Sequence, residues 1–198
     1  MTTTDLPQVL DEMHSYIRRA IAAGFETPEQ IVEGVFSYLE DQADPELLRP
    51  HAERMVGEVL EQHLRDQMEW PSITDCDRLD LAFALLERAG VVCRQNFTCC
   101  GSCGSAEIGG EIEVYESAGG RARGYAFFHQ QDTDSAVEDG GGLYLAYGAV
   151  EDGEEVGVAI GRAIEAALQQ YGLETSWSGQ LSQRIFVRLN WQRRRLEV

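Results

Sequence analysis

The sequence predicts an α+β protein in which an N-terminal helical region precedes a ferredoxin-like βαββαβ sheet with one extra strand. Up to about residue 89, apolar residues recur at the 3.6-residue spacing of amphipathic helices. From Gly90 onward, short apolar runs typical of strands alternate with helical segments. Their order over residues 91–177 is β-α-β-β-α-β, the order of the split βαβ fold. A mostly parallel three-layer α/β sheet is the alternative.

The first two helices are indicated by apolar stripes and by their end signals. The first stripe covers residues 6–21, and Gly24 follows as a stop signal. Thr27 is an expected N-cap, with Pro28 at the first helical position and Gln30 completing a capping box. The second helix is therefore expected to begin at Pro28 and to bury a stripe within residues 31–39.

The next two helices carry similar signals. Asp44-Pro45 repeats the start signal, and Pro50 is expected to shorten or kink the beginning of the third helix. That helix ends before Trp70-Pro71. Thr74 or Asp75 can cap a fourth helix, which Gly90 closes.

The second half of the chain contains the predicted strands and two further helices. Strands are expected at residues 91–93, 124–129, 143–147, 173–177 and 184–189, and helices at 103–116 and 154–171. The link 130–142 is long for a hairpin and can hold one helical turn. The expected domains are a helical domain at 1–72 and an α+β domain at 73–198 that carries the Cys99–Cys103 loop.

The split arrangement predicts where the polar loops meet. It places strand 143–147 between strands 91–93 and 124–129, which run parallel to each other. The carboxyl ends of those two strands then share one edge of the sheet, about 10 Å apart. That edge gathers the Cys99–Cys103 loop and the segment from His129 to Asp132.

Charge and composition limit the classes of function. The 198 residues carry a formal net charge of −18, which repels phosphate backbones and anionic lipids, so neither nucleic acid nor membrane is an expected partner. A basic protein partner suits this surface. No signal peptide or membrane-spanning run is evident, so a cytoplasmic location with reduced cysteines is expected. Arg193-Arg-Arg195 is expected to be a solvated tail.

Three motifs resemble those of a bacterial family classed as a domain of unknown function. They are Asn96-Phe-Thr-Cys-Cys-x-x-Cys-Gly104, Phe127-Phe-His-Gln-Gln-Asp132 and Gly140-Gly-Gly-Leu-Tyr-Leu-Ala-Tyr-Gly148. The likeness covers roughly the second half of the chain. The resemblance implies a bacterial origin and no particular activity.

The cysteine loop is the main candidate for chemistry. Cys100-Gly-Ser-Cys103 is expected to follow a strand and open a helix, a position at which the helix dipole favours a redox-active thiolate. Cys99, Cys100 and Cys103 could instead bind zinc, with His129 or a carboxylate as the fourth ligand. In the third interpretation, the three cysteines are reduced residues that fill a helix–sheet junction.

His129 and Asp132 complete the candidate site. They could act as a base and its orienting carboxylate, or as metal ligands. Alternatively, Asp132 or Thr133 caps a short helix and His129 merely ends a strand. Taken together, the sequence favours a small acidic regulatory or protein-interaction module. The alternative is a thiol- or zinc-dependent protein that uses Cys99, Cys100 and Cys103, and whether the chain is an enzyme stays open.

Overall fold

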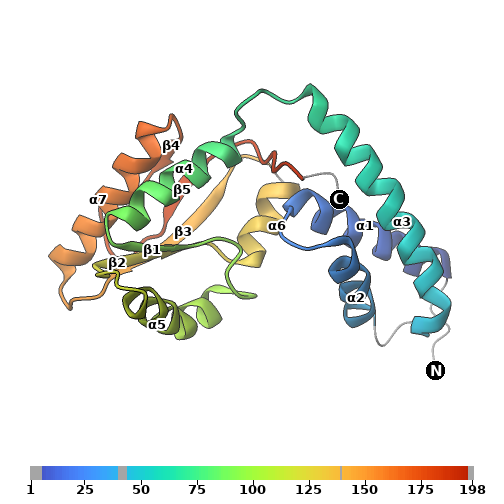
Figure 1. Cartoon of the computed structure of the whole chain (residues 1–198), viewed down its shortest axis with the longest axis horizontal. Coiled ribbons are helices and arrows are strands. Elements are labelled where there is room, and N and C mark those ends of the chain that lie inside the picture. Colours follow the sequence, from blue (N-terminus) through green and yellow to red (C-terminus); the bar gives the residue numbers. More distant parts are fainter. Residues whose placement is uncertain (1–5, 40–43, 139, 196–198) are drawn as a thin grey trace. The chain divides into compact units, whose positions relative to one another are not determined.

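A computed structural model describes residues 6–39, 44–138 and 140–195 (Figure 1). The chain divides into two compact units. One unit comprises the residues up to Ser72 together with those from Gln192 onward, and the other comprises Ile73–Trp191. The segment from Gln192 to Arg195, which the sequence grouped with the α+β domain, thus clusters with the helices. Among the described helices, none combines the length and apolarity needed to cross a bilayer.

The helical unit contains three α-helices and a short 3₁₀ helix: α1 (Leu6–Ala23), α2 (Pro28–Tyr38), α3 (Pro45–Asp66) and η1 (Gln67–Glu69). The predicted capping box of α2 is present, with Thr27 accepting from the Gln30 N–H and the Gln30 side chain accepting from the Thr27 N–H. Asp44 caps α3 through the Glu46 N–H. Pro50 lies inside α3, which continues through it as one helix.

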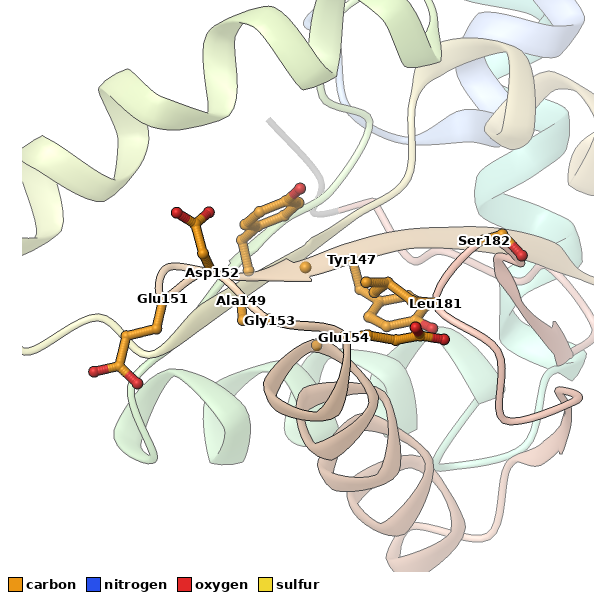
Figure 2. A pocket seen from close by; sticks show the side chains of 11 residues that line it. Tyr147, Ala149, Glu151, Asp152, Gly153, Glu154, Leu181 and Ser182 are labelled. Atoms are coloured by element: carbon orange, nitrogen blue, oxygen red, sulfur yellow. The ribbon is translucent and has the colours of Figure 1, made fainter.

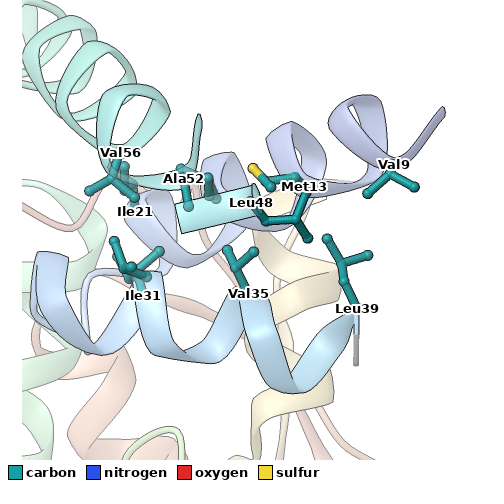
Figure 3. Close-up of a cluster of buried hydrophobic side chains, with 11 residues drawn as sticks. Val9, Met13, Ile21, Ile31, Val35, Leu39, Leu48, Ala52 and Val56 are labelled. Carbon is teal, nitrogen blue, oxygen red and sulfur yellow. The ribbon is translucent and has the colours of Figure 1, made fainter. Parts of the chain in front are cut away.

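The apolar stripes of the three helices meet in one core (Figure 3). Its buried members come from all three helices: Val9, Met13, Ile17, Ile21, Ile31, Val32, Val35, Leu39, Leu48, Ala52 and Val56. Each stripe covers only one side of its helix, so each helix needs both others to remove that side from water. Burial of these side chains, at about 1.5–3 kcal/mol for each large one, is the main force that holds the unit together.

The C-terminal segment ties the helical unit together. The Arg195 guanidinium donates to three carbonyl oxygens at and beyond the end of α1: those of Ala20 (3.1 Å), Ile21 (2.8 Å) and Glu26 (2.8 Å). The Gln67 side chain pairs with both the N–H and the C=O of Arg195 at 3.0 Å. Arg193 stacks on Phe25, with its guanidinium carbon 4.6 Å from the ring centre. The expectation of a solvated tail was therefore wrong for these residues.

The second unit contains a five-stranded mixed sheet and four helices. Its elements are α4 (Asp75–Arg88), β1 (Val91–Arg94), α5 (Gly101–Ser117), β2 (Gly124–Phe127), α6 (Gln130–Glu138), β3 (Leu143–Ala149), α7 (Glu154–Gln170), β4 (Glu174–Ser176) and β5 (Ile185–Arg188). This content confirms the predicted α+β class, with N-terminal helices before the sheet. The link predicted to hold one turn contains the nine-residue helix α6.

The strand order corrects the split topology. The order is β1-β2-β3-β5-β4, and β1 pairs directly with β2 in parallel, with Val91 opposite Gly124. The reason lies in β3, which has only two edges. Its carboxyl half pairs with β2 and its amino half pairs with β5, so no edge of β3 remains for β1. The alternative of a mostly parallel sheet is also wrong, because the other three pairings are antiparallel.

Helices cover both faces of the sheet. Figure 1 shows α4 and α7 packed together on one face and α5 on the other. Alternate residues of β2 serve the two faces. A Cβ on Gly124 would lie 2.8 Å from Ile160 of α7, whereas Phe127 lies against Gly104 of α5. This layering places the beginning of α5 beside the carboxyl ends of β1 and β2, where the cysteines lie.

Candidate functional site

The loop from Gln95 to Cys100 joins β1 to α5 in an unusual backbone conformation. Asn96 and Thr98 have φ values of 51° and 58°. A β-branched residue such as Thr98 rarely adopts this left-handed region, and such strain concentrates at functional sites. The loop keeps this conformation because it bonds to the segment after β2: the Phe97 N–H donates to the Phe128 carbonyl (2.8 Å), and the Gln130 N–H donates to the Thr98 carbonyl (3.1 Å).

The loop brings three sulfur atoms together at the surface. The Cys99 and Cys103 Sγ atoms are 3.5 Å apart, and the Sγ atoms of Cys99, Cys100 and Cys103 all lie within 4.8 Å of one another. Cys99 is exposed and the other two are partly exposed. Cys76 and Cys93 are buried instead and lie outside this group. We call Cys99, Cys100 and Cys103 the cysteine cluster.

The thiols of the cysteine cluster differ in acidity. Cys100 is the N-cap residue of α5. Hydrogen bonds from the Cys103 N–H and from the Cys103 and Cys99 thiols lower the pKa of Cys100. Hydrogen bonds to Cys99 and Cys100, together with the charge that those thiols carry as thiolates, raise the pKa of Cys103 to about 11. The cluster therefore favours a thiolate at Cys100 while Cys103 keeps its proton.

His129 and Asp132 form a capping box at the beginning of α6. The Asp132 N–H donates to Nδ1 of His129 (3.3 Å), and the His129 N–H donates to Oδ2 of Asp132 (3.1 Å). Both residues are buried. Burial lowers the pKa of His129, and the charge of Arg184 acts in the same direction, whereas the charge of Asp132 opposes them. A neutral imidazole has one proton, so while Nδ1 accepts this hydrogen bond the proton is on Nε2.

The structure brings the His129 ring to the same sheet edge as the cysteine cluster. Its Cδ2 and Nε2 atoms lie 3.6 Å from the position that a Cβ on Gly101 would occupy. His129 is nevertheless not among the residues whose ligand atoms converge with the three sulfurs. Because β1 and β2 are direct neighbours, the two loops are one strand spacing apart, about 4.8 Å, and not the two spacings that the split topology implies.

Three further polar residues support this edge. Arg184 donates to Oδ2 of Asp132 (2.5 Å) and to the Tyr144 carbonyl. Thr133 donates to Oδ1 of Asn96 (2.8 Å) and thereby joins α6 to the strained loop. The role of Arg184 could not be predicted from the sequence, because its partner Asp132 lies 52 positions away and only the fold joins them. Asn96 begins the motif that ends at Gly104, but a motif of neighbouring residues does not reveal a partner on α6.

A separate pocket lies at the opposite edge of the sheet (Figure 2). It has a volume of about 640 Å³ and lies at the carboxyl end of β3, beside the first residues of α7. Its lining includes the apolar and aromatic residues Tyr125, Tyr147 and Leu181 and the acidic residues Glu151, Asp152 and Glu154. No residue of the cysteine cluster lines this pocket, so the two features are distinct.

Comparison with known proteins identifies the family of this chain. It finds no relative whose activity is known. The model of a family described as Domain of unknown function (DUF6891) matches residues 7–195. The chain therefore belongs to this family. No curated protein and no solved structure matches the chain.

Proposed function

We propose that this member of the DUF6891 family is a thiolate metal-binding protein that holds one zinc ion with the cysteine cluster. The observation that supports this proposal is the convergence of three sulfurs within 4.8 Å at the beginning of a helix. Zinc binds thiolates at about 2.3 Å in tetrahedral sites, which places neighbouring sulfurs ~3.8 Å apart. Small side-chain rotations of Cys99, Cys100 and Cys103 can supply that spacing.

The acidity of the three thiols fits a metal site with a pH-dependent affinity. Cys103 keeps its proton because its thiol hydrogen-bonds to Cys99 and Cys100, and because a third thiolate would be repelled by their charges. A bound zinc ion compensates the three charges and displaces the protons. The Cys103 pKa of about 11 implies that metal binding near neutral pH releases a proton from this residue. The affinity for zinc is therefore expected to rise with pH.

The same cluster could instead act in thiol–disulfide exchange. In this case the Cys100 thiolate attacks a sulfur of a substrate disulfide, and one substrate thiolate leaves. The Cys103 thiol then loses its proton and attacks the Cys100 sulfur, which forms a Cys100–Cys103 disulfide and releases the second substrate thiol. Zinc binding and this disulfide exclude each other, because both use the same sulfurs.

A zinc titration of the reduced, metal-free protein with a competing chromophoric chelator tests the proposal. We expect one zinc per chain and a large loss of affinity in Cys99→Ser, Cys100→Ser and Cys103→Ser. Cys93→Ala is the matched control, because Cys93 is buried outside the cluster and its loss should leave zinc binding unchanged. Failure of the wild-type protein to retain zinc against a micromolar chelator would reject the metal site. A fast, Cys100-dependent reaction with disulfides would then favour exchange.

We also propose that the helical unit binds a basic amphipathic helix of a protein partner. A groove of about 430 Å³ lies between α2 and α3, with Val32, Val56 and Leu60 among the residues that line it. Glu29, Glu33 and Glu53 also line it. The one arginine in the lining, Arg49, already pairs with Glu33 at 2.9 Å. An apolar helix face flanked by cationic side chains complements both the lining and its charge.

Gly57 provides a sharp test of the groove. It lines the groove, and a Cβ at this position would meet no atom within 4 Å. Gly57→Trp should therefore fill the groove without disturbing the fold. The probe is a designed amphipathic helical peptide of leucine and arginine, and its binding is measured by fluorescence anisotropy. We expect at least tenfold weaker binding in Gly57→Trp and unchanged binding in Gly109→Trp, which adds the same side chain at an open glycine of α5. Equal binding to both variants would reduce the interaction to unspecific charge attraction.

A further inference from the structure

We infer that the metal site of the cysteine cluster has an open fourth coordination position, which takes a neutral nitrogen donor of the imidazole type from outside the chain. This inference rests on the proposed zinc site and assigns its ligand. Structural zinc sites are closed by four protein ligands, whereas sites that act on other molecules keep a position open. The number of donors that the chain itself can supply therefore decides which kind of site this is.

The described residues supply three donors and no fourth. Within residues 6–39, 44–138 and 140–195, no His, Cys, Asp or Glu besides Cys99, Cys100 and Cys103 has a ligand atom within 4.8 Å of all three sulfurs. The sequence suggested His129 or a carboxylate such as Asp132 as the fourth ligand, and both side chains lie at the sheet edge that carries the cysteine cluster.

The hydrogen bonds of His129 prevent it from acting as that ligand. Its Nδ1 lone pair accepts the Asp132 N–H at 3.3 Å and so forms part of the cap of α6. The proton of the neutral ring is then on Nε2, which lies 3.2 Å from Oδ2 of Asp132 and beside Gly101. Coordination through Nε2 would require the proton to move to Nδ1. The Nδ1–H and the Asp132 N–H would then be two donors facing each other, and their hydrogen bond would be lost. Metal binding by His129 would therefore break the N-terminal cap of α6.

Asp132 is held equally firmly. Its Oδ2 atom accepts from the His129 N–H (3.1 Å) and from Arg184 (2.5 Å), and only 7% of the residue is exposed. Moving this carboxylate to the metal would break its ion pair with Arg184 and its hydrogen bond from the His129 N–H. Among the described residues no donor remains, so we infer that the fourth position takes a ligand from solvent, which reaches the cluster because Cys99 is exposed.

Charge selects the class of that ligand. Three thiolates and one Zn²⁺ ion give the site a net charge of −1, and the whole chain carries −18. An anionic ligand must approach against this field, whereas a neutral donor is not repelled. Zinc prefers nitrogen and sulfur ligands, and imidazole is the neutral nitrogen donor that proteins and small molecules present most often. Water occupies the position when no such ligand is present.

Cobalt-loaded full-length protein tests the inference, because the visible spectrum of Co²⁺ reports its ligands. We expect a saturable spectral shift on titration with free imidazole and none with acetate at the same ionic strength. His129→Gln should give the starting spectrum of the wild type and the same shift. If the spectrum of cobalt-loaded His129→Gln differs from that of the wild type before imidazole is added, the inference is overturned, because His129 is then a fourth ligand.

Two other results would also count against the inference, and they separate its failure from that of the metal site. Cobalt bound through three thiolates but insensitive to imidazole would overturn the open position and leave the proposed metal site intact. No thiolate-to-cobalt absorption at all would reject the metal site and the inference together. Analytical sedimentation of the cobalt-loaded protein shows whether the ligand comes from a second copy of the chain. A metal-dependent dimer whose spectrum matches the imidazole-bound form would assign the donor to a histidine of a second copy of this chain.

Discussion

The pKa values of Cys100 and Cys93 are shifted in opposite directions because their surroundings differ. Cys100 lies at the beginning of α5, where N–H groups point toward its sulfur, and its pKa is lowered. Cys93 is 6% exposed on β1, and burial raises its pKa far above the usual range. The reactive species of a cysteine is the thiolate, so the two residues should differ greatly in rate.

The first prediction concerns this difference in rate. With iodoacetamide under reducing, metal-free conditions near neutral pH, Cys100 should be alkylated at least tenfold faster than Cys93 and Cys76. The fast phase should disappear in Cys100→Ser and persist in Cys93→Ala. Peptide mass spectrometry identifies the modified residue. Labelling of all five thiols only after denaturation would show that these cysteines are packing residues.

The second prediction concerns His129 and pH. Its folded pKa lies below the usual value of about 6.5, so on acidification the unfolded state takes up the proton first. The stability that neutral His129 contributes is fully present above about pH 6.5 and decreases as the pH falls toward the folded pKa. His63 acts with the same sign, since burial lowers its pKa too. The two contributions must therefore be separated by mutation.

His129→Asn provides that separation, because asparagine caps helices well and does not titrate in this range. Denaturant unfolding at several pH values between about 7.5 and 5.5, on either side of the reference value, should show a smaller loss of stability on acidification for the variant than for the wild type. An unchanged pH dependence in the variant would assign the whole effect to His63 and to the carboxylates.

At the scale of elements, the contact between α5 and β2 depends on Gly104. A Cβ at this position would lie 2.4 Å from Cε2 of Phe127, a side chain with 0% exposure that has no room to move. Gly104→Ala should therefore destabilise the α+β unit by about 1–2 kcal/mol, because overpacking outweighs the gain in helix propensity. Gly110→Ala on the same helix is the matched control. It meets no atom within 4 Å and should stabilise the unit by up to ~1 kcal/mol. Thermal unfolding measures both, and equal effects would contradict the close packing of α5.

The end of α1 depends on a residue from the other end of the chain. Arg195 donates three hydrogen bonds to the carbonyls of Ala20, Ile21 and Glu26, and such charge-assisted bonds contribute more than neutral ones. Arg195→Ala should destabilise the helical unit by about 2–3 kcal/mol. Arg18→Ala removes an exposed arginine from α1 and should change stability by less than about 0.5 kcal/mol. Denaturant unfolding followed by circular dichroism compares the two, and a similar small effect of both would show that the C-terminal segment does not hold the unit.

The elements were more predictable than their pairing. Local signals such as the capping box begun by Thr27 act within a single turn, so the sequence shows them directly. The sheet order depended on whether β5 or β1 takes the free edge of β3, and the partial alternation of residues 184–189 carried no information about that. The edge that carries the cysteines and His129 could still be predicted, because it follows from the direction of β1 and β2 alone. The roles of Arg184 and of the His129 cap arise from contacts that only the folded chain creates.

At the scale of the whole molecule, each unit has its own stabilising interactions. The helical core consists of residues from α1, α2 and α3, and the C-terminal segment adds its hydrogen bonds to the same unit. The α+β unit buries β1, β2 and β3 under α4, α5 and α7. The cysteine cluster lies in the second unit and the acidic groove in the first, so the two proposed functions can be tested by mutation independently of each other.

The last prediction follows from the charge of the whole chain. Proteins bind nucleic acids largely by neutralising phosphates with basic side chains, and this chain carries a formal charge of −18. Three arginines are also engaged within the protein: Arg195 caps α1, Arg184 pairs with Asp132, and Arg94 pairs with Glu87 and Glu111. We therefore expect no binding of duplex DNA or RNA at physiological salt in an anisotropy titration that extends to micromolar protein. A sub-micromolar dissociation constant that weakens steeply with added salt would prove this expectation wrong, since it would require a basic surface that the chain's charge argues against.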